Sequence, residues 1–141
     1  MALDALRATP IFAEVPDEHL QRLAAQAIPM SLHAGDFLIS EGEQADDLFV
    51  VVSGEFDVTK RSGTSEIPLA RVGPGAIQGE LAALERGRRM ASVRAVSDAD
   101  VLRIPYLAVR DLLSGGPDAA LGIIRTVIDE VVPRVRESFP I

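Results

Sequence analysis

Residues 73–93 read GPGAIQGELAALERGRRMASV, and this stretch decides how the chain is interpreted. Gly79 has no Cβ, so its backbone can approach a bound group closely. The helix-forming residues 80–84 predict a short helix whose free N–H groups make an anion site at the Gly79 end. The Glu80 carboxylate can accept a hydrogen bond from a sugar hydroxyl, and Arg89 can present a planar fork to phosphate oxygens. The stretch therefore predicts one small pocket for an anion and a sugar.

Short strands are expected on both sides of this stretch. Eight glycines between residues 35 and 87 mark turns in a strand-rich middle. The strand patterns, either wholly apolar or alternating, fall at residues 37–39, 48–52, 55–60, 67–72, 90–96 and 100–104, with a hairpin turn at 61–64. Many short strands at this spacing favour a sandwich, a barrel or a jelly-roll-like fold.

Both flanks of the chain are expected to be helical. Residues 16–18 (PDE) are expected to form the first turn of a helix that Pro29 ends, and Pro105 is expected to open another helix that runs through Leu113. Asp118 begins a further predicted helix, in which Pro133 is expected to cause a kink. Its apolar residues share one face: Ala120, Ile124, Val127, Ile128, Val131 and Val135. This face suits packing on the β domain, a mobile lid or a dimer seam, and the pattern leaves these alternatives open.

Composition restricts the possible partners. The net charge is −7, so the chain is a poor match for nucleic acid or anionic lipid, and we expect neither a nucleic-acid partner nor a membrane partner. The longest strongly apolar run, residues 48–52, is far shorter than a membrane span, and the N-terminus has no signal-peptide pattern. Disulfides and thiolate metal sites are excluded because the chain has no cysteine. We expect a cytoplasmic protein.

The stretch resembles the phosphate-binding cassette of cyclic nucleotide-binding domains, the β-roll modules of catabolite activators and protein kinase A regulatory subunits. Residues 79–82 (GELA) match the helix start of that cassette, and residues 89–93 (RMASV) match its arginine strand. Residues 34–43, 46–55 and 101–105 resemble other strands and turns of the family. The resemblance implies a mainly β fold with flanking helices, namely a jelly-roll-like double-stranded β-helix. One domain over residues 1–141 would comprise N-terminal helices (1–30), a β-roll (31–104) with the cassette (73–93), and C-terminal helices (105–141).

The resemblance also implies roles for individual residues. Glu80 would bind the ribose 2′-hydroxyl, Arg89 would bind the exocyclic phosphate oxygens, and the last helix would close over the base. The backbone amides that would complete the phosphate cradle lie near Gly79, Leu81, Ala82, Met90 and Ala91. Family members that favour guanine often carry threonine where this chain has Met90, so the resemblance favours cyclic AMP over cyclic GMP.

Two other functions compete with this one. A β-roll that has lost its ligand would serve only as a protein-interaction or structural domain, and the pairing of Glu80 with Arg89 argues against it. A cupin-like metalloenzyme needs several converging histidines and carboxylates, whereas the two histidines are His19, in the predicted N-terminal helix, and His33. We therefore expect a regulatory module with no catalytic residue, no metal and no cofactor besides its ligand. Its output would pass through the C-terminal helix to a fused effector domain or a twin subunit.

Overall fold

The computed structural model describes residues 2–78 and 87–114, and all structural statements below concern these residues. Three helical segments, α1 (Ala2–Arg7), the 3₁₀ helix η1 (Pro10–Phe12) and α2 (Asp17–Gln26), come first along the chain. The strands follow as β1 (Ile28–Leu32), β2 (Phe37–Ile39), β3 (Asp47–Ser53), β4 (Phe56–Ser62), β5 (Ser65–Val72), β6 (Ile77–Gln78), β7 (Ser92–Ala95) and β8 (Ala99–Pro105). Helix α4 (Tyr106–Leu113) ends the described chain.

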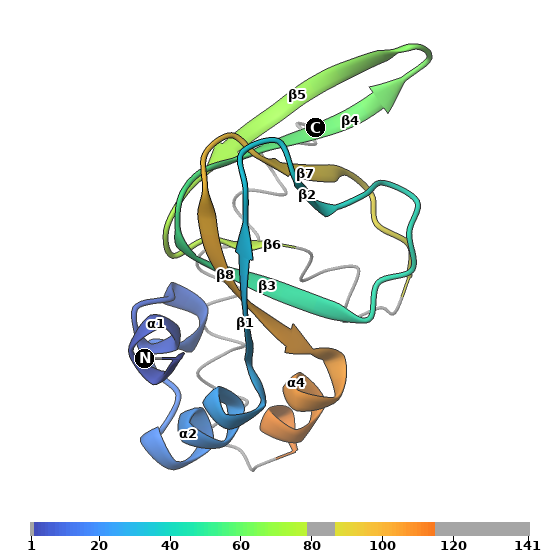
Figure 1. The fold of residues 1–141 in the computed structure, drawn as a ribbon. Helices are drawn as coiled ribbons and strands as arrows, with labels where there is room; N and C mark the ends of the chain where they lie inside the picture. The colour runs from blue at the N-terminus through green and yellow to red at the C-terminus, as the bar shows by residue number, and fades with distance from the viewer. Residues whose placement is uncertain (1, 79–86, 115–141) are drawn as a thin grey trace, which may run out of the picture.

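The strands form two antiparallel sheets of four strands each. One sheet has the order β1-β8-β3-β6 and the other the order β2-β7-β4-β5. Helices α1, α2 and α4 gather at one end, beside the first sheet, while the β4–β5 hairpin projects at the other end (Figure 1). The predicted mainly β, jelly-roll-like fold with flanking helices is therefore confirmed.

The space between the two sheets is filled by one apolar core. Its buried members come from strands of both sheets: Leu32, Ile39, Phe49, Val51, Phe56, Val93, Ala95, Ala99 and Val101. Because side chains alternate across a strand, the odd-numbered residues Phe49 and Val51 of β3 face this interior. These residues therefore identify the inner face of the first sheet.

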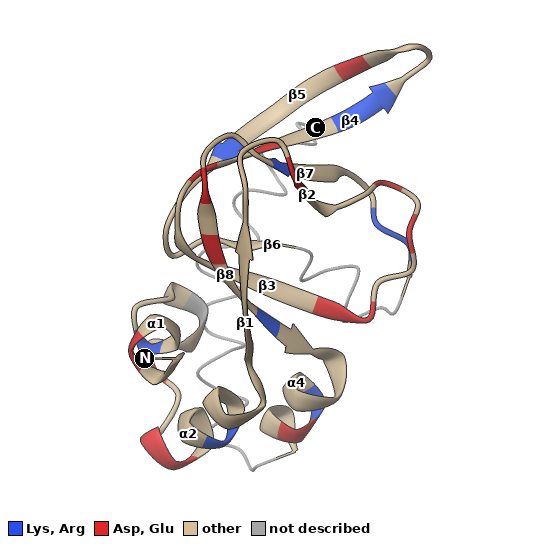
Figure 2. Ribbon diagram, viewed as in Figure 1, with Lys and Arg blue, Asp and Glu red and all other residues tan. Residues whose placement is uncertain are grey.

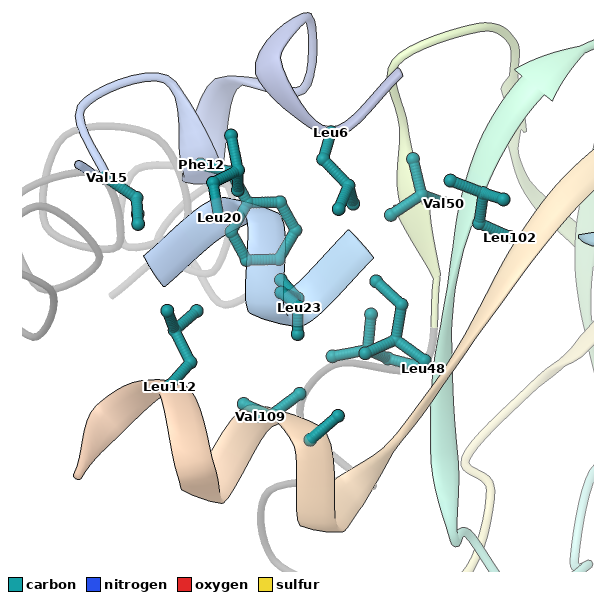
Figure 3. Packing of buried hydrophobic residues seen from close by; sticks show 12 residues of the cluster. Leu6, Phe12, Val15, Leu20, Leu23, Leu48, Val50, Leu102, Val109 and Leu112 are labelled. Atoms are coloured by element: carbon teal, nitrogen blue, oxygen red, sulfur yellow. The ribbon is translucent and has the colours of Figure 1, made fainter. Parts of the chain in front are cut away.

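A second core lies between the outer face of the first sheet and the helices. The even-numbered residues Leu48 and Val50 of β3, with Leu102 and Ile104 of β8, meet buried side chains from the helical segments. Figure 3 shows Leu20 and Leu23 of α2 lying between the side chains of α4 and those of the sheet. Strands β3 and β8 are thus covered on both faces, which explains the continuous apolar run at residues 48–51, whereas Val52 at the end of the predicted run is exposed.

The sequence predicted most strands within a few residues and missed two. Strand β1 includes Pro29, which was expected to end the preceding helix; that helix instead ends at Gln26, and the strand begins at Ile28. Proline is tolerated here because, among the strands that the structure describes, β1 is an edge strand that pairs with β8 alone. The two-residue strand β6 is too short to leave a periodic pattern, and β7 is shorter than the predicted 90–96.

The turn between β3 and β4 depends on a glycine. Gly54 has φ +85°, and a Cβ added there would lie 2.5 Å from Ala99 Cβ and 2.6 Å from the Asp98 carbonyl oxygen. A side chain at this position would therefore clash with the start of β8 and would also strain the backbone. Gly63, in the β4–β5 hairpin, has φ +64° but no atom within 4 Å of the same added Cβ.

Candidate functional site

The backbone around Arg89 is fixed by the loop that joins β2 to β3. The Arg89 N–H donates to the Glu43 carbonyl at 2.8 Å, and the Arg89 carbonyl accepts from the Gly42 N–H at 2.9 Å. The Ala45 N–H also donates to the Gly87 carbonyl at 2.9 Å. Residues 87–89 therefore lie along this loop, which leads directly into β3.

The Arg89 side chain is buried, with 6% of the residue exposed. Its Nη2 donates to the Asp47 carbonyl oxygen at 2.7 Å and to Asp47 Oδ1 at 2.9 Å. Its guanidinium carbon lies 5.8 Å from the centre of the Phe49 ring. A cation held against both the backbone and the side chain of one residue has a fixed position, which is the property that an anion-binding arginine needs.

Asp47 is the counter-ion of this site, and it carries more than one interaction. Burial raises its pKa above the ordinary value, and the nearby Asp46 acts in the same direction, whereas Arg89 and Arg103 oppose them. Arg103 Nη1 lies 3.7 Å from Asp47 Oδ2, whereas Arg89 Nη2 donates to Oδ1 of the same carboxylate. One carboxylate is thus placed between two arginines.

The residues after Arg89 have unlike environments. Met90 is 61% exposed, and its carbonyl accepts a hydrogen bond from Lys60 Nζ at 3.0 Å. Ala91 is half-buried, and Ser92 Oγ accepts a hydrogen bond from the Glu41 N–H at 2.9 Å. These bonds connect the start of β7 to β4 and to the end of the β2 region.

The structure describes three of the seven candidate ligand-binding residues: Arg89, Met90 and Ala91. The other four, Gly79, Glu80, Leu81 and Ala82, lie outside the described residues, as do the predicted helix after Asp118 and the expected kink at Pro133. Sequence reasoning missed Asp47. The available signal was an acidic residue at the entrance of a strand predicted to be buried.

Among residues 2–78 and 87–114, charged positions of both signs are interspersed along the chain. Lys and Arg are spread over helices and strands among acidic residues (Figure 2). Arg94 is exposed on β7, where its guanidinium carbon lies 5.7 Å from the centre of the Phe37 ring. Arg89 and Arg94 thus both lie over a phenylalanine, but only Arg89 is buried and paired with a carboxylate.

Neither histidine belongs to a metal-ligand cluster within the described residues. His19 is buried on α2, with Nδ1 3.1 Å from Arg22 Nη2, while His33 is exposed in the β1–β2 loop. No helix in the described part of the chain is long and apolar enough to cross a membrane.

Both the sequence and the fold of this chain are similar to those of known proteins. The sequence model of the family described as "Cyclic nucleotide-binding domain" matches residues 29–115, which run from the second residue of β1 through α4 and include the whole predicted cassette. The regulatory domain of Toxoplasma gondii PKA, crystallised with cAMP, is 28% identical with a TM-score of 0.74. That alignment covers 78% of this chain and 42% of the other.

Two relatives contain a similar sequence within much longer proteins. An uncharacterized NTE family protein of Mycobacterium tuberculosis is 32% identical over 126 residues, which are 89% of this chain and 21% of that protein. The cGMP-dependent protein kinase egl-4 of Caenorhabditis briggsae is 34% identical over 101 residues, or 72% of this chain and 13% of that kinase. The chain thus spans about a fifth or less of the length of these relatives.

Proposed function

The chain belongs to the family of cyclic nucleotide-binding domains, and from that premise we propose that residues 73–93 bind a cyclic nucleotide whose phosphate contacts Arg89. The observation that carries this proposal is the burial of Arg89 against Asp47 and Phe49. An arginine with only a structural role at the surface has no need of such a setting, because burying a guanidinium removes it from water at a cost. A buried and oriented guanidinium, by contrast, can bind a phosphate without first being ordered.

The remaining contacts are assigned by family resemblance. Glu80 accepts the hydrogen bond of the ribose 2′-hydroxyl, and the backbone amides near Gly79, Leu81 and Ala82 surround the phosphate with those near Met90 and Ala91. The segment after Asp118 closes over the base and passes occupancy onward as a population shift between two states. The module itself has no catalytic role.

Cyclic AMP is the proposed ligand. Met90 has no hydroxyl group to offer to guanine, and the co-crystallised Toxoplasma domain is described as bound to cAMP. The egl-4 relative is described as cGMP-dependent, so cyclic GMP is the competitor that an experiment must include.

The lengths of the relatives support regulation of a fused effector domain. Since this sequence fills about a fifth or less of those proteins, it has the size of one module among several. A homodimer joined through the C-terminal helix is the alternative route for the output. Both routes are compatible with a cytoplasmic module that contacts neither nucleic acid nor membrane.

Isothermal titration calorimetry with cyclic AMP, cyclic GMP and 5′-AMP tests the proposal. We expect cyclic AMP to bind most tightly and Arg89→Ala to weaken it by about 2–5 kcal/mol, or roughly 30-fold to a few thousandfold. Arg94→Ala is the matched control, because it removes an exposed arginine beside the other phenylalanine.

The possible outcomes separate the alternatives. If Arg89→Ala and Arg94→Ala lose equal affinity for cyclic AMP, Arg89 does not contact the ligand. Absence of heat and of any melting shift with every nucleotide would favour the interaction-only β-roll, since a ligand at a hundred times its dissociation constant should stabilise the fold by about 2.7 kcal/mol.

A further inference from the structure

Arg103 faces the interior of the β-roll, on the same side of the first sheet as Phe49. In the strand register Arg103 is paired with Phe49 of β3 and with Ile28 of β1. Directly opposite residues of neighbouring strands lie on the same face, and Phe49 belongs to the core between the sheets. Val101, two residues before Arg103, is in that core as well. An arginine therefore continues the inner face at the point where the apolar core gives way to Asp47 and Arg89.

The contacts of Arg103 are incomplete by the standard of a structural ion pair. Nη1 lies 3.7 Å from Asp47 Oδ2, beyond hydrogen-bond distance, and 42% of the side chain is exposed. Its Nε is buried without a hydrogen-bond partner among the described residues. Such a loose contact gains little from geometry, so the main effect of Arg103 on Asp47 is electrostatic.

The charges of this cluster explain why a second arginine matters. Arg89 and Asp47 together are neutral, so the pair alone offers a phosphate no net attraction. Arg103 brings the three side chains to a net charge of +1, which matches the single negative charge of a cyclic phosphodiester.

We propose that Arg103 is a positioning residue of the nucleotide site: its charge balances that of Asp47 and so leaves the charge of Arg89 for the ligand phosphate. Asp47 then holds Arg89 in place without cancelling its attraction for an anion. This inference rests on the proposed function, because it concerns the ligand that Arg89 binds. It adds a residue on β8, outside the cassette, to the determinants of affinity.

Calorimetric titration with cyclic AMP tests the inference in four variants. Arg103→Gln should weaken binding about 5- to 20-fold, as expected for the loss of one unit charge that acts on the phosphate at an effective dielectric constant near 20. Arg103→Lys, which keeps the charge, should remain within about threefold of the parent protein. Arg94→Gln removes an equal charge from the exposed β7 position and should have no effect.

The fourth variant separates charge balance from simple structural support. Asp47→Asn combined with Arg103→Gln restores the net charge of +1, and the asparagine oxygen can still accept a bond from Arg89. The double variant should therefore recover most of the affinity that Arg103→Gln loses. Loss of affinity that persists in the double variant, with unfolding midpoints unchanged, would overturn the inference.

Failure of the inference and failure of the proposed function give different results. If the parent protein binds no cyclic nucleotide, the proposed function and the role of Arg103 fall together. If the parent binds and Arg103→Gln binds equally well, only the role of Arg103 is refuted. A measurement without ligand gives an independent check: Arg103→Gln should raise the pKa of Asp47, followed by carboxyl NMR, while Arg94→Gln should leave it in place.

Discussion

Replacing Arg89 with methionine should destabilise the protein even when no ligand is present. The change keeps most of the apolar stem but removes the Nη2 bonds to the Asp47 carbonyl, at 2.7 Å, and to Oδ1, at 2.9 Å. Breaking a buried ion pair from one side costs about 3–5 kcal/mol, because the other charge is left behind. Arg103 remains near Asp47 and offsets part of this cost, so we expect a loss of about 2–4 kcal/mol at pH 7.

This loss can be measured as a change in melting temperature. With an unfolding entropy of about 2.1 cal/mol/K per residue, a chain of 141 residues has an unfolding entropy of about 0.3 kcal/mol/K. The melting temperature should therefore fall by about 7–13 °C at pH 7. The fall should be smaller at pH 4.5, because the Asp47 left behind can take up a proton and lose its charge.

Two further variants make this prediction refutable. Arg94→Met, which removes an exposed arginine lying over Phe37, should change stability by no more than about 1 kcal/mol. Arg89→Met with Asp47→Asn should regain part of the loss, since the buried charge is gone. If Arg89→Met melts with the parent protein at both pH values, the ion pair does not stabilise the fold and the reasoning from its burial is wrong.

Three more results are expected. Gly54→Ala should lower the unfolding free energy by about 2–5 kcal/mol in urea denaturation, from backbone strain plus the clash with β8, whereas Gly63→Ala should cost only about 1 kcal/mol. Glu80→Ala should weaken cyclic AMP about 10- to 100-fold and its 2′-deoxy analogue much less; equal losses in calorimetry would show that Glu80 does not read the hydroxyl. The folded chain holds the Asp47 proton more tightly than the unfolded chain, whose pKa is about 3.9, so the contribution of Asp47 to stability should fall as pH rises from about 4 through the raised folded pKa. The unfolding free energy of Asp47→Asn, measured from pH 4 to pH 7, should therefore lack this part of the pH dependence. An equal pH dependence in the variant and the parent protein would contradict the prediction.

The sequence was most informative where a pattern is local. The strands at 37–39 and 48–52 were predicted because turns bound them and their apolar residues are contiguous. Strand β1 was not predicted because it is recognisable only by its edge position in the sheet, which depends on pairing with β8 some seventy residues away. Pro29 has the same local meaning in a helix end and in an edge strand, so tertiary context alone decides between them.

Of the residues in the candidate site, those with a local sequence pattern were predicted and those brought in from distant strands were not. Arg89 was identified from its neighbours in the cassette, which lie within a few residues of it. Its partner Asp47 is 42 residues away, and no local spacing connects the two. Arg103 is further hidden because an arginine in a strand is ordinarily taken as a solvent-facing position. Only the register with Phe49 shows that it faces inward.

Strands β3 and β8 have a consequence for the use of this chain as an engineered part. Leu48 and Val50 face the helices while Phe49 and Val51 face the space between the sheets, so a single backbone carries residues of both cores. Removing the helices to obtain a smaller sensor would expose one apolar face of β3 and β8 to water. Asp47 lies on β3 and Arg103 on β8. A β-roll without the helices should therefore lose both its shape and the residues that position Arg89, and any fusion is better attached beyond the helices than in place of them.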